Sequence, residues 1–278
     1  MTPGGQDGAD QDQAPGPRVS DRRLDPADTQ AGKSPTTPGR LSLWRELGDF
    51  LAFLKHPTLR RGAGRLAGRV PVSGAAAEWT SGLALSRLLF WLVVLWTVNF
   101  MVLGPLAVGV ADGNGVERVR PLLPSQWPYV VLWAPLVEEM LFRFWLRRPP
   151  GWPLYTLMAA AAFLLGPGWW LALIVVSLGA WRLVQVLQPT QALPWARLRR
   201  LRRRFPIYLH LSVLAFALGH LGNYQGGDTA WWLLPLVVLP QWFTGLVLAW
   251  MRVRQGIGAA IAMHAGFNSL PLFLLYLY

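Results

Sequence analysis

The sequence predicts an all-α, polytopic membrane protein with about seven transmembrane helices, preceded by an interfacial amphipathic helix. Hydrophobic residues make up 53% of the 278 residues and charged residues 14%, which leaves too little polar surface for a water-soluble globule of this size. After residue 121, the acidic residues are only Glu138, Glu139 and Asp228. Apolar runs long enough to cross a bilayer alternate with arginine-rich segments.

The lack of cysteine limits the chemistry that the chain can carry out. With Cys 0, the protein has no disulfide, no thiolate nucleophile and no cysteine-held metal or iron–sulfur site. Its formal net charge of +12 lies largely beside apolar runs, where basic residues are typical of cytoplasmic anchors against anionic lipid. We therefore expect the lipid bilayer, and no nucleic acid, as the partner of these charges.

The chain divides into three parts by composition. Residues 1–40 are rich in Pro, Gly, Asp, Gln and Thr, which predicts a disordered cytoplasmic tail. Residues 41–85 contain an amphipathic helix and a linker, and residues 86–278 form the membrane domain. The helix is predicted to lie in the membrane interface, and packing on the protein's own cytoplasmic face is the open alternative. Its apolar side consists of Leu43, Trp44, Leu47, Phe50, Leu51 and Leu54.

The membrane domain is predicted to contain seven spans, beginning from a cytoplasmic N-terminus. This number places the arginines at 147–148, in a loop at 197–204, and at 252–254 on the cytoplasmic side, as the positive-inside rule requires. Only the Gly166-Pro167-Gly168 break separates the third span from the fourth, and a single bent helix is the alternative. The spans are expected at residues 86–110, 127–147, 150–166, 168–187, 207–224, 230–251 and 256–278.

Two glutamates near the middle of the second span require an explanation. Each carboxylate costs about 2.5 to 3.5 kcal/mol at the bilayer centre on insertion-type scales. Glu139 and Arg143 are four residues apart and share a helical face, so an ion pair can offset part of this cost. Glu138 points about 100° away from Glu139 and needs a different partner.

Two later spans carry polar side chains at a similar depth. One has Phe216 and His220 four residues apart, and the other has His264 and Asn268 four residues apart. At 1.5 Å of rise per residue, both histidines come within about two turns of Glu138, so the three can converge in one cavity. The alternative is that each histidine forms an isolated interhelical hydrogen bond.

Other polar residues of the spans have simpler interpretations. Asn99, Gln241 and Thr244 are expected to form interhelical hydrogen bonds. Pro135, three residues before Glu138, is expected to kink its helix and to make room for water.

The set of buried groups favours hydrolysis. A carboxylate and an imidazole that share a water molecule can act as a general base, and an imidazole with a carboxamide can stabilise an oxyanion. The sequence contains no H-E-x-x-H zinc helix, no G-x-S-x-G serine turn and no aspartate within a predicted span. Among these intramembrane hydrolytic designs, only one based on glutamate and histidine remains.

Three motifs around these residues resemble those of the CPBP family, the CaaX-type and bacteriocin-processing intramembrane proteases also called Abi. The motifs are E-E-x-x-x-R, F-x-x-x-H and H-x-x-x-N, in the family's order, and the resemblance covers residues 86–278. It implies a glutamic-type endopeptidase in which Glu138 and His220 activate the attacking water. It further implies that His264 and Asn268 bind the carbonyl oxygen as it becomes negative. By the same resemblance, the supporting residues are Glu139, Arg143 and Phe216.

The resemblance leaves two forms of the site open. No cofactor is expected, because the H-x-x-x-N element suits oxyanion binding better than metal ligation. The alternative is a divalent metal such as zinc, held by Glu138, His220 and His264.

We expect the protein to hydrolyse a peptide bond of a membrane-associated protein or peptide. A non-catalytic scaffold or bacteriocin-immunity-type protein of the same fold is one alternative. A proton-coupled transporter is another, since buried Glu, His and Arg also form proton relays. The 24 Arg and 2 Lys indicate a GC-rich coding sequence and a multi-pass protein of a bacterial cytoplasmic membrane. Leader peptides or small membrane proteins fit such a setting better than prenylated CaaX tails.

Overall fold

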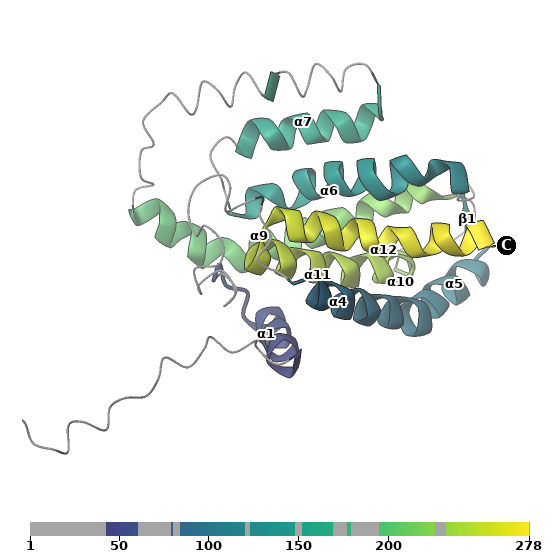
Figure 1. Ribbon diagram of the computed structural model, residues 1–278, viewed down its shortest axis with the longest axis horizontal. Helices are drawn as coiled ribbons and strands as arrows, with labels where there is room; N and C mark the ends of the chain where they lie inside the picture. The colour runs from purple at the N-terminus through teal and green to yellow at the C-terminus, as the bar shows by residue number, and fades with distance from the viewer. Residues whose placement is uncertain are drawn as a thin grey trace, which may run out of the picture. The chain divides into compact units, whose positions relative to one another are not determined.

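The computed structural model has the helical architecture expected from the sequence. Two strands of two residues each, β1 and β2, accompany the helices and pair antiparallel (Figure 1). The predicted tail at 1–40 and almost all of the predicted span at 168–187 lie outside the described residues. The structure describes residues 43–60, 79, 84–119, 123–147, 152–168, 177–178, 195–225 and 232–277.

Several of the helices are joined end to end through a π- or 3-10 segment. The π-helices are η2 and η4, and the 3-10 segments are η3, η5 and η6. In chain order the elements are α1 (Leu43–Lys55), α4 (Leu85–Val98), η2 (Asn99–Leu103), α5 (Gly104–Asp112), β1 (Glu117–Arg118), η3 (Pro124–Gln126), η4 (Pro128–Trp133), α6 (Ala134–Phe142), η5 (Phe144–Arg147), α7 (Trp152–Leu165), α9 (Trp195–Gly219), η6 (His220–Asn223), β2 (Tyr224–Gln225), α10 (Leu234–Val237), α11 (Leu239–Gln255) and α12 (Ile257–Leu277).

Three helical stretches among the described residues are long and apolar enough to cross a membrane. They are Leu85–Asp112, Arg199–Asn223 and Ile257–Leu277. Helix α7 is apolar but shorter. These apolar helices indicate an integral membrane protein. The number of seven spans stays a prediction.

Two of the predicted spans are interrupted helices. The segment 127–147 passes from η4 into α6, which ends at Phe142, and Arg143 follows with φ −125°. The segment 230–251 is divided at Val238 into α10 and α11. Each of α10 and α11 has a proline in its first turn, where the missing N–H is tolerated, so the prolines begin new helices.

The arginines at 197–204 belong to a helix and not to the predicted loop. They form the first part of α9, which continues into the apolar segment. Arginine is a good helix former, and Arg202, Arg203 and Arg204 extend their side chains to the exterior. The hydropathy change that marks the end of a span therefore does not mark the end of the helix.

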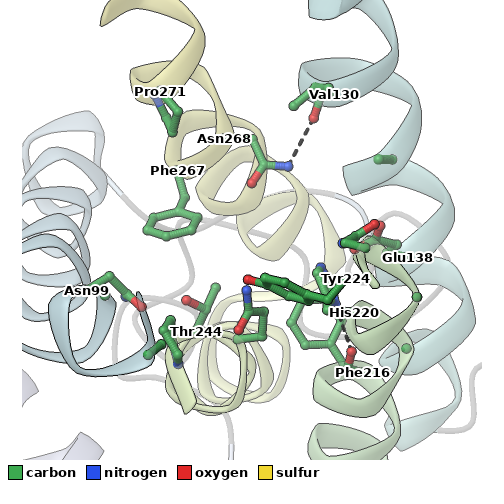
Figure 2. A pocket seen from close by; sticks show the side chains of 18 of the residues that line it. Asn99, Val130, Glu138, Phe216, His220, Tyr224, Thr244, Phe267, Asn268 and Pro271 are labelled. Atoms are coloured by element: carbon green, nitrogen blue, oxygen red, sulfur yellow. Dashed lines mark hydrogen bonds between the residues drawn. The ribbon is translucent and has the colours of Figure 1, made fainter. Parts of the chain in front are cut away.

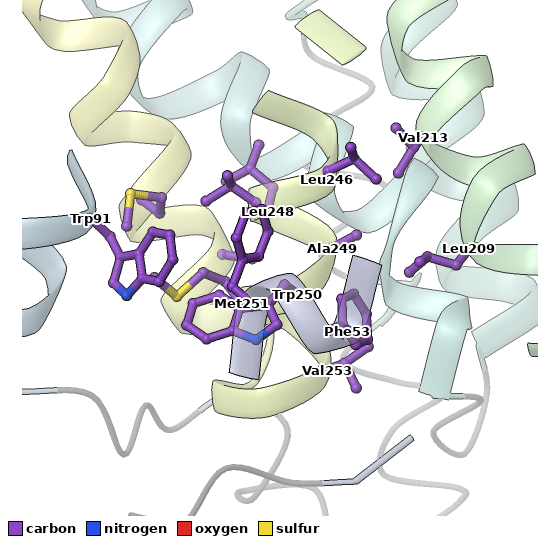
Figure 3. Packing of buried hydrophobic residues seen from close by; sticks show 14 of the residues in the cluster. Phe53, Trp91, Leu209, Val213, Leu246, Leu248, Ala249, Trp250, Met251 and Val253 are labelled. Carbon is purple, nitrogen blue, oxygen red and sulfur yellow. The ribbon is translucent and has the colours of Figure 1, made fainter. Parts of the chain in front are cut away.

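Helix α11 lies at the centre of the membrane domain. It packs against α9 and α12 and also contacts α1, and every residue from Thr244 to Gln255 is buried. The apolar core gathers around it, as Figure 3 shows for Trp250, Leu248 and Met251 beside Trp91 of α4. The Trp91 and Trp250 ring centroids are 4.6 Å apart.

Helix α1 packs on this core, which is the alternative that the sequence left open. Phe50 and Phe53 are buried, and Phe50 contacts the rings of Trp91 and Trp250 edge-on. The outer side of α1 remains apolar, because Leu43, Trp44 and Leu51 are exposed. A role of this outer side at the membrane interface stays a prediction.

Candidate active site

A π-helix precedes the two glutamates. The N–H of Ala134 bonds to the carbonyl of Tyr129, five residues earlier, in place of the α-helical partner Val130. The next N–H in this register would come from residue 135, which is a proline and has none. Asn268 of α12 takes its place and donates from Nδ2 to the Val130 carbonyl at 3.0 Å. Pro135 therefore lies where a π-helix passes into α6. The carbonyl that this proline leaves without an N–H is bonded by an amide on another helix.

Glu139 and Arg143 form the ion pair expected from their spacing. Both side chains are fully buried, and Arg143 Nη1 donates to Glu139 Oε1. The Arg143 guanidinium also lies over the Phe216 ring, 4.1 Å from its centroid. Gly245 makes this stacking possible, because a Cβ there would lie 3.3 Å from Phe216 Cδ1 and 3.4 Å from Arg143 Nη2.

His264 is held between the two glutamates. Its Nδ1 lies 2.9 Å from Glu139 Oε1, and its Nε2 lies 3.7 Å from Glu138 Oε2. The first distance is a hydrogen bond and the second is too long for one. Glu138 Oε2 is buried and has no hydrogen-bond partner among the described residues. Glu138 therefore lies beside the His264 imidazole, at the edge of a cavity, without a hydrogen bond to it.

His220 begins the 3-10 segment that follows α9. Its Nδ1 donates to the Phe216 carbonyl at 2.8 Å, which leaves Nε2 as the nitrogen with a free lone pair in the neutral ring. The Phe216 ring lies beside both histidines, with centroid distances of 4.7 Å to His220 and 5.7 Å to His264. Phe216 thus separates the two imidazoles from the apolar core.

The four residues expected to be catalytic line one cavity of about 1290 Å³. Figure 2 shows Glu138 and His220 on one side of the cavity. Asn268 borders the cavity from α12. Phe216 also lines the cavity, whereas Glu139 and Arg143 lie behind its wall. The arrangement places one carboxylate, two imidazoles and a carboxamide around one space, with the second carboxylate behind the wall. The residues expected to be catalytic are Glu138, His220, His264 and Asn268.

The alternative metal set does not form a ligand cluster. Within the described residues, which include Glu138, His220 and His264, no group of three His, Asp or Glu side chains is arranged to hold a metal ion. The Nδ1 atoms of the two histidines bond to Glu139 and to the Phe216 carbonyl, which leaves both Nε2 atoms available and does not distinguish the two forms of the site.

Sequence reasoning missed a positioning role for Arg252. Its side chain is fully buried within the protein. Arg252 donates from Nε to the Arg143 carbonyl at 3.2 Å and from Nη2 to the Phe144 carbonyl at 3.0 Å. These bonds hold the chain where α6 ends. No local signal separates this arginine from an ordinary flanking charge.

Arg254 is also buried within the protein, and its place on the cytoplasmic side stays a prediction. It donates to Asp49 of α1 at 2.7 Å and to the carbonyls of Thr58 and Arg60. Trp250 donates from Nε1 to the same Asp49 carboxylate at 2.9 Å. The C-terminal part of α11 is therefore tied to α1 on one side and to the end of α6 on the other.

One of the comparisons with known proteins identifies a family. A family model described as type II CAAX prenyl endopeptidase, Rce1-like, matches residues 120–270, more than half of the chain. The matched segment contains all seven residues of the three motifs. No curated protein and no solved structure matches the chain.

Proposed function

The chain belongs to the Rce1-like family of type II CAAX prenyl endopeptidases, and we propose that it hydrolyses peptide bonds by a metal-free, glutamic mechanism in the cavity bordered by Glu138. The observation that carries the proposal is the position of His264, which is bonded to buried Glu139 through Nδ1 and directed toward Glu138 through Nε2. This arrangement supports a site in which one carboxylate orients the imidazole and the other handles a proton.

In the first half of the reaction, Glu138 and His220 activate a water molecule. The bond from His220 Nδ1 to the Phe216 carbonyl leaves Nε2 able to accept a hydrogen bond from this water. Glu138 removes a proton from the water as the oxygen forms its bond with the carbonyl carbon of the substrate. The electron pair of the carbonyl moves to its oxygen, which becomes negative.

His264 and Asn268 stabilise this oxyanion. A protonated His264 donates through Nδ1 to Glu139 and keeps its Nε2–H for the oxyanion. The Asn268 amide uses one N–H for the Val130 carbonyl and has a second N–H to donate. When the C–N bond breaks, the leaving nitrogen takes the proton from Glu138, which restores the carboxylate.

Glu139, Arg143 and Phe216 support the site, and Glu139 and Arg143 do so from behind the cavity wall. Arg143 donates to Glu139, and this carboxylate holds the His264 ring in one orientation. Phe216 packs against the Arg143 guanidinium and both catalytic imidazoles. We assign them as positioning residues.

The substrate that we propose is a membrane-associated protein or peptide in a bacterial cytoplasmic membrane. The cavity lies between apolar helices, so a substrate reaches it from the bilayer or its surface. Leader peptides and small membrane proteins are the proposed class, and the lipid bilayer is the proposed medium. We propose no nucleic-acid partner.

The test is cleavage of a quenched fluorescent peptide library by the full chain in proteoliposomes. Glu138→Gln and His220→Ala are expected to lower kcat/KM by about 100-fold or more, the usual contribution of general acid–base catalysis. His210→Ala is the matched control, because His210 is an exposed histidine on α9, the helix that ends just before His220, and its removal should change little.

A strong chelator separates the metal-free mechanism from the alternative. Cleavage that survives the chelator and is lost in both variants supports the proposal. Cleavage that stops with chelator and returns with zinc overturns the metal-free mechanism. Full cleavage by Glu138→Gln overturns the role of Glu138. The non-catalytic scaffold is favoured if wild type cleaves no peptide and cells that carry either variant behave like cells that carry wild type.

A further inference from the structure

A second group of polar atoms borders the cavity. Asn99 Oδ1, Gln241 Oε1 and Thr244 Oγ1 are buried, and none has a hydrogen-bond partner within the part of the chain that the structure describes. All three residues line the cavity, and Asn99 and Thr244 are each only 3% exposed. Figure 2 shows Asn99 and Thr244 on the side of the cavity away from Glu138 and His220.

The arrangement differs from the interhelical hydrogen bonds expected for these residues. Buried side-chain oxygens without a partner are uncommon, because each loses its hydrogen bonds with water and gains none. Three such oxygens on one cavity wall are a cluster and not an isolated defect. The cavity beside them is the place from which a bound group can supply their partners.

Local structure fixes the direction of the Asn99 amide. Asn99 begins π-helix η2, and its Nδ2 donates to the Leu95 carbonyl at 2.8 Å, so Oδ1 is the free end. The π-turn closes when the Gly104 N–H bonds to the Asn99 carbonyl, and only glycine fits there because a Cβ would lie 2.6 Å from that oxygen. Single π-turns are frequent at functional sites, and η4 borders the same cavity.

The chemistry of this wall selects its ligand. Two carboxamide oxygens accept hydrogen bonds and one hydroxyl can accept or donate, and none of the three carries a charge. In the bilayer core, each main-chain N–H of an extended peptide needs an acceptor that water does not provide. Gln241 and Thr244 are three residues apart on α11, with about 5 to 6 Å between such Cβ atoms. Main-chain N–H groups on one side of an extended peptide repeat every second residue, or about 6.6 Å.

We propose that Asn99, Gln241 and Thr244 form a subsite that binds main-chain N–H groups of an extended substrate segment next to the scissile bond. The inference rests on the proposed peptidase function. The subsite holds the substrate backbone across the cavity from Glu138, so that affinity does not depend on a particular side chain at these positions.

Two substitutions remove the polar atoms and keep the side-chain size. Thr244→Val and Gln241→Met are expected to raise KM by about 3- to 10-fold, the range for one hydrogen bond, with little change in kcat. Their melting temperatures without substrate are expected to stay equal or to rise, since an unpartnered buried atom is lost. Asn99 is left unchanged because its amide also supports the helix.

Thr156→Val is the matched control. Thr156 on α7 has a buried hydroxyl that is also without a partner in the described structure, but it does not line the cavity. Its removal is expected to leave KM unchanged. The comparison separates loss of a ligand contact from loss of a buried hydroxyl.

The substrate is the peptide from the library above that wild type cleaves fastest, with analogues in which one amide near the scissile bond becomes an ester. An ester removes one N–H. For each of Thr244 and Gln241, we expect one analogue that raises KM for wild type by about 3- to 10-fold. The same analogue should cause no further rise in KM in the variant of that residue. Such non-additivity identifies the N–H that each residue binds.

Two outcomes overturn the subsite and are distinct from failure of the peptidase. A lower melting temperature with unchanged KM in Thr244→Val assigns the residue to helix packing. Equal effects of every ester in wild type and variants mean that the wall does not bind the backbone. In both cases Glu138→Gln remains inactive, whereas failure of the proposed function appears as full cleavage by Glu138→Gln or none by wild type.

Discussion

The side-chain amide of Asn268 donates a hydrogen bond to the carbonyl oxygen of Val130 at 3.0 Å. The two residues lie on α12 and η4, and the bond replaces an N–H that Pro135 lacks. The helix with both glutamates is therefore tied to the helix that carries His264 by a contact one turn from the histidine. This contact makes the geometry of the cavity depend on Asn268 even without substrate.

Asn268→Ala is expected to lower the free energy of unfolding by about 1 to 3 kcal/mol, because the Val130 carbonyl loses its donor. Adding Pro135→Ala provides an N–H at residue 135 and is expected to restore part of this loss. Thermal unfolding in detergent measures both. Ser269→Ala is the control, since the hydroxyl of Ser269 bonds within α12, to the Gly266 carbonyl. Strictly additive effects of the two substitutions would contradict this account.

Gly245→Ala is expected to disturb the stacked Arg143 and Phe216. The added Cβ would lie 3.0 Å from Val213 Cγ1 and close to both stacked side chains, so they must shift. Overpacking of this kind costs about 1 to 3 kcal/mol of stability, and we expect kcat to fall about 10-fold as His264 loses its orientation. Gly109→Ala is the control, because nothing lies within 4 Å of its Cβ. Equal activities of Gly245→Ala and Gly109→Ala would show that the stacking of Phe216 and Arg143 does not support catalysis.

The pairing of Asp49 predicts a loss of stability in acid. Burial by itself raises the pKa of Asp49, but hydrogen bonds from Arg254 and Trp250 outweigh it and lower the pKa below its ordinary value. The stabilisation is present above the pKa of the unfolded chain and is lost as pH falls through the lower pKa of the folded chain. Asp49→Asn is expected to cost about 1.5 to 3 kcal/mol at pH 7 and less in acid, as measured by thermal unfolding across pH.

Glu46, on the same helix, should behave in the opposite way. Burial raises its pKa, although Arg87 and the Trp91 indole act against this. The ionised form is thus disfavoured by folding, and its cost falls as pH drops toward the raised pKa. Glu46→Gln is expected to leave stability at pH 7 unchanged or higher. A loss as large as that of Asp49→Asn would show that the charge of Glu46 is needed.

Arg252→Lys is expected to reduce both stability and kcat. Lysine cannot reproduce the two directed bonds to the Arg143 and Phe144 carbonyls, and the loss of one buried bond from a charged group costs about 1.5 to 3 kcal/mol. Unfolding and peptide cleavage measure the effect. Arg203→Lys, at an exposed position on α9, is the control and should change neither. Wild-type kcat in Arg252→Lys would exclude a positioning role.

Much of the helical architecture and the composition of the site follow from local sequence patterns. Hydropathy predicts the helices near 86, 150, 207 and 256, because burial in lipid depends on the composition of each segment. The Glu139–Arg143 pair follows from a spacing of four residues within one helix. The arginines at 197–204 show the limit of such patterns, because hydropathy reports the membrane boundary and not the helix boundary.

By itself, the sequence determined the membrane class, the main apolar helices and the polar residues available for chemistry, since these depend on neighbours along the chain. Only the tertiary structure decided which partners those residues take. His264 lies between the two glutamates, Asn268 donates to the Val130 carbonyl, and Arg252 is buried against the end of α6. Asn99 Oδ1 has no partner among the residues that the structure describes. Each of these outcomes depends on the packing of helices far apart in the chain, and no periodicity within one helix encodes that packing.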